Sequence, residues 1–393
     1  MFTGDFDTAI APIDTATFFS EYWEQRPLSV TRNNPHYYSN LFSMRDVDAV
    51  IGFTEPKFPQ IQLFSNGKSV PWNSACERAG MQNINQIYDE YDRGNTVILR
   101  GLHHCWKPIS ELYRNWESLF HHRVHVNMYL TPKNAQGFAP HFDTHEVFIL
   151  QIEGSKHWRI YDTFQAIPLP INQQPIPPEK LQEPLQEITL NAGDLLYLPS
   201  GYVHEALTSE CSSLHLTVGI NVYRWSDLLA TALASASDQV VSLRKALPVG
   251  FLRQREARDL LKTRFEELLA IFSDRANLEE AFKHLSQRVI EEMPPIPDGH
   301  FTQLDRLDEI DLDTIIKKRQ GTICQVVREP NSVTIQFPGN AVKGPTHIEP
   351  ALQFIVNSPV FPVGSLPDSL TDNAKLTLVR RLVKEGLLAI ATS

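Results

Sequence analysis

The sequence has little cysteine and no long apolar run. Its 393 residues include four cysteines, none of them in a Cys-x-x-Cys pair: Cys76, Cys105, Cys211 and Cys324. So few cysteines argue against a disulfide framework and against a zinc knuckle. No apolar run approaches the roughly 18 residues that span a bilayer, and no basic segment of the secretory type opens the chain. We therefore expect a soluble, cytoplasmic protein without a membrane partner.

A basic surplus is also absent. Lys and Arg number 36 against 46 Asp and Glu, which gives a formal net charge of −10. This balance argues against a protein that binds nucleic acid through bulk charge, so we expect no direct nucleic-acid partner. Hydrophobic residues make up 42% of the chain and charged residues 21%. That composition is typical of a globular protein with a large core, and the length suggests two or three domains.

The central part of the chain, about 123–222, has the pattern of short β-strands. Along 123–130 an apolar face, Val124, Val126, Met128 and Leu130, alternates with a polar face, His125, Asn127 and Tyr129. Four further segments predict strands: 146–152, 156–161, 194–199 and 213–220. We expect the first two of these to form a hairpin across Glu153–Ser155. Short strands separated by Gly and Pro turns predict a barrel or jelly roll.

The segments around this region predict helices and loops. Residues 14–50 look largely helical with an aromatic face, 95–100 predict a strand that ends at Gly101, and 110–120 predict a helix. The stretch 167–184 contains six prolines and therefore predicts a loop, which could cover a pocket.

The chain changes character after residue 224. Apolar residues recur at helical spacing along 225–293, which predicts two or three amphipathic helices. The tail, 294–393, mixes patterns, with a strand expected at 333–339 and helices at 347–358 and 373–388. Its basic residues at 317–319 and 380–381 are interpreted as solvated faces. The expected domains are 1–224, 225–293 and 294–393.

Two segments carry the candidate chemistry. The first is His141-Phe142-Asp143, which is a weak signal by itself. The second, Gly193 to His204, has the spacing Gly-x5-Pro-x-Gly-x2-His, the second cupin motif, which is far more specific. On a strand, residues i and i+2 point the same way, so His141 and Asp143 would enter one cavity, and a neighbouring strand would present His204 to it.

Two histidines and one carboxylate make a facial triad. Such a triad leaves coordination positions open and is typical of non-haem Fe(II) oxygenases, whereas a structural zinc site has four ligands. His145 lies on the same face as His141 and Asp143 and is a competing ligand candidate. The alternative for all of these histidines is a structural role in the core.

The sequence resembles a known family in these segments. Residues 141–161, HFDTHEVFILQIEGSKHWRIY, together with 193–207 and 213–221, resemble the JmjC/cupin hydroxylases. The similarity is strongest to the ribosomal-oxygenase branch, which includes the bacterial arginine hydroxylase of a large-subunit ribosomal protein. The resemblance implies an α+β fold: a double-stranded β-helix (cupin/JmjC jelly roll) with N-terminal helices, a helical dimerisation region at 225–293 and a winged-helix-like domain at 294–393.

The same resemblance implies roles for individual residues. It implies Fe(II) on His141, Asp143 and His204, with 2-oxoglutarate and O2 as co-substrates. Lys156, 15 residues after the first histidine, would pair with the distal carboxylate of 2-oxoglutarate; the alternative is a surface lysine beside a turn. Four further residues are candidates for co-substrate contacts: Asn127, Tyr129, His215 and Thr217. For them the alternative is a polar stripe that faces solvent.

The expected function is hydroxylation of an amino-acid side chain in a protein, with a ribosomal protein as the candidate substrate and succinate and CO2 as by-products. A homodimer is expected. Three alternatives stay open at this point: a tailoring hydroxylase of a biosynthetic peptide or small metabolite, a JmjC demethylase, and a non-catalytic cupin. The sequence does not identify the residue type that is oxidised.

Overall fold

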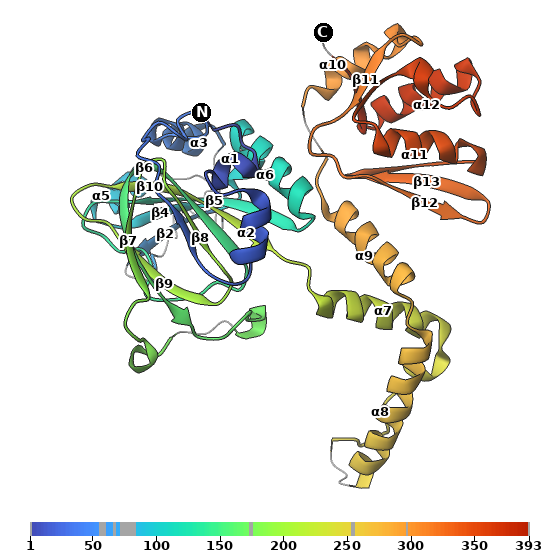
Figure 1. Ribbon diagram of the computed structural model, residues 1–393. Helices are drawn as coiled ribbons and strands as arrows, with labels where there is room; N and C mark the ends of the chain where they lie inside the picture. The colour runs from blue at the N-terminus through green and yellow to red at the C-terminus, as the bar shows by residue number, and fades with distance from the viewer. Residues whose placement is uncertain are drawn as a thin grey trace. The chain divides into compact units, whose positions relative to one another are not determined.

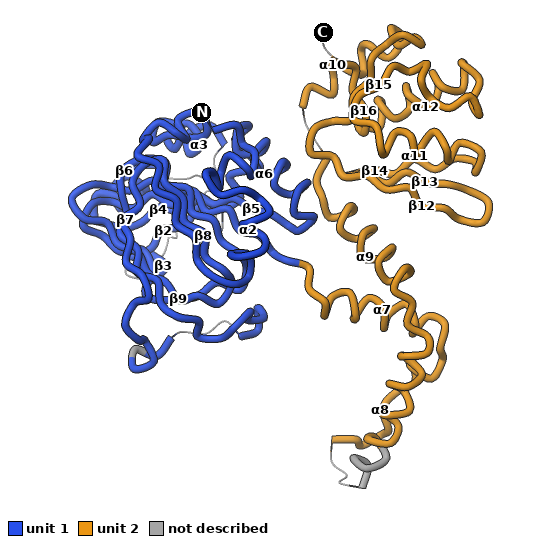
Figure 2. The backbone as a smooth tube through the Cα atoms, in the orientation of Figure 1, with its two compact units in different colours: residues 1–222 blue, residues 223–393 orange. Residues whose placement is uncertain are grey.

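The computed structural model describes residues 2–54, 60–65, 68–70, 84–172, 176–252, 256–295 and 298–391. The chain divides into two compact units, residues 1–222 and 223–393 (Figure 2). No helix in these ranges combines the length and the apolar character needed to cross a membrane. Cys76 lies outside the described residues.

The first unit is built on antiparallel strands (Figure 1). The strands are β1 (Leu28–Val30), β2 (Ile61–Ser65), β3 (Lys68–Ser69), β4 (Thr96–Leu99), β5 (Arg123–Thr131), β6 (Glu146–Thr163), β7 (Gln186–Asn191), β8 (Leu195–Leu198), β9 (Tyr202–Leu207) and β10 (Ser213–Asn221). The larger sheet has the order β1-β8-β6-β10-β5-β4-β2-β3, while β7 and β9 pair with the second half of β6. The expected antiparallel β architecture is therefore confirmed, and β6 belongs to both layers.

The predicted hairpin at Glu153–Ser155 is wrong. β6 runs through this point without reversing, and its first half pairs with β8 and β10 while its second half pairs with β7 and β9. The pairing with β10 skips Ile152, two residues before Gly154, and Gly154 itself has a φ of +68° and a Cβ position that would lie 1.8 Å from the Ser212 carbonyl oxygen. A bulge bends a strand without ending it, and Gly154 permits the positive φ and the close approach next to it, so the signal for a turn marked a crossing between layers.

Helices cover the outer face of the larger sheet. They are α1 (Phe6–Ile10), α2 (Thr15–Glu21), α3 (Met44–Thr54), α5 (Ile84–Asp92) and α6 (Lys107–Phe120). Phe6, Phe18 and Trp116 pack edge to face against Phe148 of β6 or against one another, in the main core. The expectation of a largely helical 14–50 is wrong, because β1 lies between α2 and α3 and pairs with β8. The strand at 95–100 and the helix at 110–120 are confirmed.

β5 and β10 show why alternation in the sequence was informative. The even-numbered apolar residues of β5 are buried in the core, as are Leu214, Leu216, Val218 and Ile220 of β10. The two strands pair residue by residue, so His215 lies opposite Tyr129 and Thr217 opposite Asn127. The polar faces of both strands therefore point together into the interior of the barrel, and the solvent-facing alternative is wrong.

The second unit begins with three helices, which confirms the expectation for 225–293. They are α7 (Trp225–Gln239), α8 (Glu256–Arg275) and α9 (Leu278–Glu292). α7 and α9 pack through small residues and a Ser235–His284 hydrogen bond of 2.8 Å. Large apolar side chains nevertheless stay exposed on all three helices: Trp225, Leu229, Leu233, Phe265, Leu269, Leu278 and Phe282.

The tail has its own core and two three-stranded sheets. Its elements are α10 (His300–Asp305), β11 (Ile315–Lys318), β12 (Gln325–Glu329), β13 (Ser332–Phe337), β14 (Asn340–Gly344), α11 (Glu349–Asn357), β15 (Val360–Pro362), α12 (Asp372–Lys384) and β16 (Leu388–Ile390). The strand expected at 333–339 and the helices expected at 347–358 and 373–388 are confirmed by β13, α11 and α12. The sheets have the orders β15-β11-β16 and β12-β13-β14.

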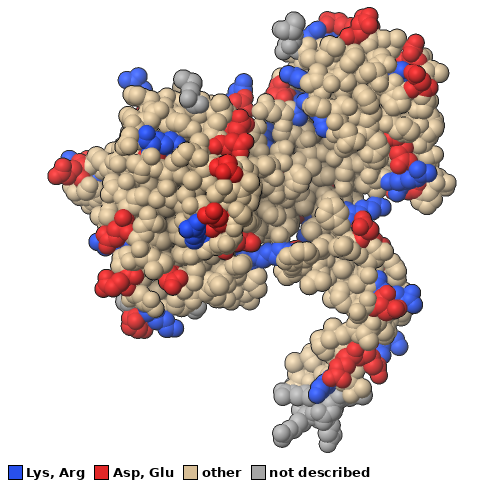
Figure 3. All heavy atoms as spheres, viewed as in Figure 1, with Lys and Arg blue, Asp and Glu red and all other residues tan. Residues whose placement is uncertain are grey.

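The basic residues of the tail are partly internal. Arg319 is buried and forms an ion pair with Asp298, and Arg380 donates to the Ile310 carbonyl at 2.7 Å. The interpretation of 317–319 and 380–381 as solvated faces is therefore wrong for these two arginines. On the face of the molecule in Figure 3, Lys and Arg are interspersed with Asp and Glu.

Candidate active site

A cavity of about 760 Å³ lies inside the barrel of the first unit. Its wall is formed by inward-facing residues of β5, β6, β9 and β10, together with the segment 138–145 that precedes β6. Ile176 and Leu181 also line it. Both belong to the Pro-rich stretch 167–184, so this loop does reach the cavity, as the sequence suggested.

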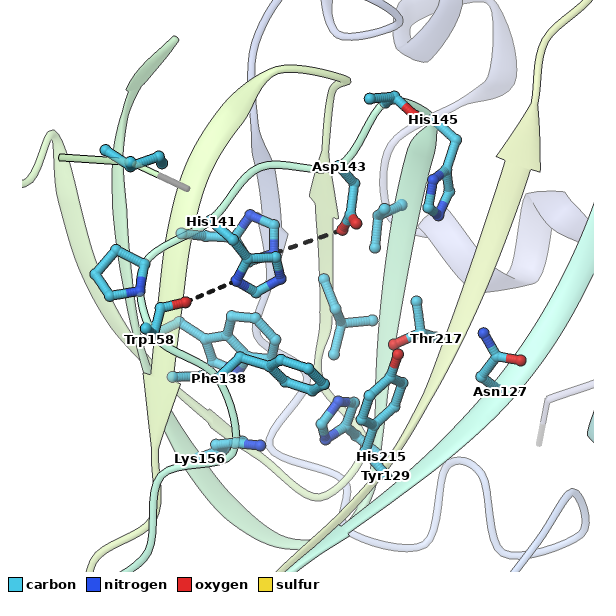
Figure 4. Close-up of a pocket in the computed structure, with 18 of the residues that line it drawn as sticks. Asn127, Tyr129, Phe138, His141, Asp143, His145, Lys156, Trp158, His215 and Thr217 are labelled. Atoms are coloured by element: carbon cyan, nitrogen blue, oxygen red, sulfur yellow. Dashed lines mark hydrogen bonds and ion pairs between the residues drawn. The ribbon is translucent and has the colours of Figure 1, made fainter. Parts of the chain in front are cut away.

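His141, Asp143 and His204 meet at this cavity, as predicted. Their ligand atoms all lie within 4.8 Å of one another, and Nε2 of His204 lies 3.6 Å from Oδ2 of Asp143 (Figure 4). The backbones of His141 and His204 hydrogen-bond to each other in both directions, at 3.1 and 2.8 Å. This short antiparallel bridge brings together residues that are 63 positions apart.

The strand expected for His141 and Asp143 is reduced to this single bridge. The alternation of side chains survives, because Phe142 between them is buried in a separate apolar cluster. Gly201 of the second motif has a φ of +92°, and a Cβ there would lie 2.3 Å from the Gln165 carbonyl oxygen. The glycine is therefore required for the turn that delivers His204.

The tautomers of both histidines are set by backbone carbonyls. Nδ1 of His141 lies 2.9 Å from the Ala139 carbonyl oxygen, and Nδ1 of His204 lies 3.0 Å from the Tyr202 carbonyl oxygen. Each Nδ1 must donate, so each Nε2 keeps a lone pair. Burial lowers the pKa of His204 to about 4, which keeps that imidazole neutral. Burial by itself would raise the pKa of Asp143. His145, His141 and His204 outweigh this effect and bring the pKa below its usual value, so the carboxyl stays ionised.

This donor set fits a divalent transition metal. Two imidazole nitrogens and one carboxylate are preformed on one side of the cavity, and the cavity supplies room for further ligands on the other side. His145 was a competing ligand candidate, but it is not part of this group of ligand atoms. Its ring lies 5.0 Å from that of His125 instead.

Lys156 is placed deep in the same cavity. Its side chain is 5% exposed, its Nζ donates to Thr131 Oγ1 at 3.0 Å, and no acidic partner is found for it among the described residues. Burial lowers the pKa of Lys156 to about 7. A buried ammonium without a counter-ion is costly, so this position favours an anionic ligand. The alternative of a surface lysine is wrong.

The remaining four predicted residues also line the cavity. The rings of Tyr129 and His215 are stacked at 5.0 Å with an interplanar angle of 1°, and Asn127 and Thr217 lie beside them (Figure 4). His215 is buried, its Nδ1 has no hydrogen-bond partner among the residues that the structure describes, and burial lowers its pKa well below the usual value. A buried, unpartnered nitrogen of this kind is suited to a polar ligand.

Thr131 was missed by the sequence reasoning. It accepts from Lys156 and from Thr96 Oγ1, at 3.0 and 3.2 Å, and is itself fully buried. Thr131 continues the polar face of β5 that holds Asn127 and Tyr129, one residue beyond the segment predicted as a strand, and its partner Lys156 lies 25 residues further along the chain. The sequence therefore contains no local signal for this contact.

The chain is similar to known proteins over the segments that form this site. Residues 104–228 match the family model of the JmjC domain. Ribosomal oxygenase 2 from Mus musculus is 31% identical over 332 residues, which cover 78% of this chain and 69% of the mouse protein. The chain belongs to the ribosomal oxygenase family. Ribosomal oxygenase 2 from Bos taurus is 33% identical, and the match covers 70% of this chain but 60% of the bovine protein.

A solved ribosomal oxygenase has the same fold. The structure of YcfD from Escherichia coli, in complex with cobalt and 2-oxoglutarate, superposes with a TM-score of 0.56 at 19% identity. The match covers 97% of this chain and 99% of the other. The expected membership of the ribosomal-oxygenase family and the JmjC/cupin fold are thus confirmed.

Proposed function

We propose that this ribosomal oxygenase is an Fe(II)- and 2-oxoglutarate-dependent enzyme that hydroxylates an amino-acid side chain of a ribosomal protein. One observation carries the proposal: a preformed His-Asp-His triad lines the same cavity as a buried lysine that has no acidic partner in the described part of the chain. The triad suits the metal, and the lysine suits the far carboxylate of a dicarboxylic acid. A binding module without catalysis would need neither feature.

The residues of the site then have distinct roles. His141, Asp143 and His204 hold the metal and leave coordination positions open for 2-oxoglutarate and O2. The bound iron would supply the oxidation of an unactivated C–H bond, with 2-oxoglutarate converted to succinate and CO2. Lys156, positioned by Thr131, pairs with the distal carboxylate. Asn127, Tyr129, His215 and Thr217 complete the polar wall.

The protein limits side reactions by enclosing the site. Phe138, with its ring 5.4 Å from that of His141, and Trp158, 6.0 Å from that of His204, place apolar surface beside the triad. Ile176 and Leu181 add apolar cover from the Pro-rich loop. Such surfaces exclude water while a substrate side chain is positioned.

The second unit supports a larger assembly. We propose that 225–293 mediates a homodimer, because α7, α8 and α9 expose more large apolar side chains than a connecting segment needs. We further propose a winged-helix-like domain at 294–393, a catalytic domain at 1–224, and a cytoplasmic location. Helices α11 and α12 with the sheet β12-β13-β14 are the elements that support the winged-helix-like assignment.

Mass spectrometry tests the proposed activity. Total ribosomal proteins of the source organism are incubated with the enzyme, Fe(II) and 2-oxoglutarate, and a parallel reaction omits 2-oxoglutarate. A stable gain of 16 Da in a ribosomal protein, only in the complete reaction, supports hydroxylation. Loss of a methyl group would indicate demethylation. If only a free amino acid or metabolite gains oxygen, the enzyme is a tailoring hydroxylase.

A further inference from the structure

A buried carboxylate lies on the face of β6 that points away from the cavity. Glu146, the first residue of this strand, is fully buried. It shares its face of the strand with Phe148 of the main core, whereas Val147 and Ile149 on the other face line the cavity. The ring of Tyr197 lies 4.7 Å from that of Phe148 in the same core. A carboxylate in aromatic surroundings is costly unless its oxygens accept hydrogen bonds.

Both oxygens of Glu146 accept from the part of the chain that leads to His204. Oε1 accepts from the backbone N–H of Ser200 at 3.2 Å, and Oε2 accepts from the hydroxyl of Tyr197. Burial raises the pKa of Tyr197, so this hydroxyl keeps its proton and donates. Tyr197 belongs to β8, and Ser200 belongs to the turn 199–201 between β8 and β9. One carboxylate therefore holds the turn and the strand that precedes it.

The same turn is bound to the backbone of Asp143. The N–H of Gly201 donates to the Asp143 carbonyl at 2.9 Å. Asp143 and Glu146 lie three positions apart in the chain, as do Gly201 and His204. The segment 143–146 and the turn 199–201 are thus joined at both ends, so a displacement of the turn would move His204 relative to Asp143.

The segment that follows α2 binds on both sides of this turn. The backbone N–H of Glu24 donates to the hydroxyl oxygen of Tyr197 at 3.0 Å, and the hydroxyl of Tyr202 donates to the Gln25 carbonyl at 2.9 Å. The carbonyl oxygen of Tyr202 in turn lies 3.0 Å from Nδ1 of His204. The hydrogen bonds around Glu146 therefore continue to the imidazole of a metal-ligand candidate.

We propose that Glu146 is a positioning residue for the metal triad, which fixes the turn 199–201 and thereby the separation of Asp143 from His204. This role rests on the proposed function, because it concerns the residues that would hold the metal. Hydrogen bonds behind the ligands of a metal site orient them, and the loss of such a bond typically costs about 10- to 100-fold in metal affinity. A carboxylate suits the role, since it accepts at two positions, whereas an amide has an acceptor oxygen at one of them only.

Glu146→Gln in the full-length protein tests this role. The variant keeps the volume of the side chain but turns a donor group toward either the Ser200 N–H or the Tyr197 hydroxyl. The Kd for Co(II) is measured without O2 by the visible absorption of the bound ion, and the melting temperature is recorded alongside. The Kd is expected to weaken roughly 10- to 100-fold, with a changed spectrum at saturating Co(II). A wild-type Kd with an unchanged spectrum overturns the role of Glu146.

Glu117→Gln is the matched control. Glu117 of α6 is likewise buried, and it accepts from the hydroxyl of Tyr113 and from the backbone N–H of Val124. It does not belong to the described wall of the cavity. Its replacement should lower the melting temperature and leave the Kd for Co(II) as it is. If both variants lose the same metal affinity, the cause is a weakened fold, and the positioning role is overturned.

Tyr197→Phe gives a second reading, which also decides the matter if Glu146→Gln does not fold. This variant removes one hydroxyl and keeps the ring in the core, so Glu146 loses one of its two donors. The Kd for Co(II) is expected to weaken about tenfold. An unchanged Kd overturns the role of Glu146.

Asp143→Ala distinguishes a failure of this role from a failure of the proposed function. If the wild type and Asp143→Ala bind Co(II) equally well, the metal is not held by the triad, so the proposed function fails and the role of Glu146 fails with it. If Asp143→Ala loses Co(II) while Glu146→Gln binds it as the wild type does, only the role of Glu146 fails.

Discussion

The inside of the barrel and the helices α7, α8 and α9 differ in the polarity of the side chains that they bury and expose. The barrel buries polar groups, among them Lys156 and His215, for which the chain supplies incomplete partners. The three helices expose apolar groups, such as Leu229 and Phe282, which the chain leaves uncovered. The first region is therefore suited to small polar or charged ligands, and the second to another protein surface. One chain therefore carries two different candidate binding regions, a polar cavity and an apolar helical surface, and each can be tested separately.

The largest effect is expected at the triad. Replacing His141 or Asp143 by Ala removes a metal ligand from a set of three, so turnover of 2-oxoglutarate should be abolished. Release of CO2 from 2-oxoglutarate measures this. His157→Ala is the matched control, because His157 lies on the outer side of β6 and pairs with Glu187. Full turnover in either triad variant would contradict the assignment.

Lys156→Ala should act on the co-substrate and spare the metal. A charge-assisted pair in a shielded site contributes roughly 1.5–3 kcal/mol, so the apparent KM for 2-oxoglutarate should rise about 10- to 150-fold. Steady-state kinetics and a separate titration with Co(II) distinguish the two effects. Lys133→Ala changes an exposed lysine beyond β5 and should leave KM as it is. An unchanged KM in Lys156→Ala would move the anchor to His215 or Tyr129.

The exposed apolar side chains of the helices are tested by placing charges on them. A Leu229→Asp/Phe282→Asp double variant puts charges on the exposed apolar faces of α7 and α9, so the dimer should weaken by roughly 100-fold in Kd. Multi-angle light scattering at micromolar concentration checks the mass. Phe53→Asp, on an exposed residue of α3, is the control and should not change it. A wild-type chain that is monomeric under these conditions would refute the dimer.

The smallest effect concerns pH. Free Lys156 has a pKa of about 7, and the carboxylate of 2-oxoglutarate binds the protonated form. Affinity should therefore fall as pH rises, with KM increasing about fivefold from pH 7 to pH 8. Lys156→Arg keeps its charge in this range, so its KM should be nearly independent of pH. A pH profile of KM that is the same for both proteins would exclude Lys156 as the anchor.

The sequence was informative where a pattern is local. The alternation in β5 and β10 identified both the buried face and the cavity face, because neighbouring strands in a sheet orient their side chains together. The spacing from Gly193 to His204 identified a turn that only glycine permits. Both signals depend on residues close together in the chain.

Predictions from the sequence were wrong where the conformation of a segment depends on a pairing partner far away in the chain. Gly154 was interpreted as the centre of a hairpin, although the choice between a turn and a bulge depends on β7 and β9, which pair with the continuing strand. β1 was hidden within a helical pattern because its partner, β8, lies about 170 residues away. The contact of Thr131 with Lys156 likewise joins two different strands and arises only in the folded barrel.

The most direct test of the central claim is the stoichiometry of the reaction under 18O2. The measurement compares succinate formed with 18O atoms gained by ribosomal protein, in the wild type and in Asp143→Ala. We expect one 18O atom in the ribosomal protein for each succinate formed in a coupled turnover. With Asp143→Ala we expect neither labelled protein nor succinate. Unlabelled oxygen from water in the protein product, or equal succinate formation in Asp143→Ala, would contradict the central claim.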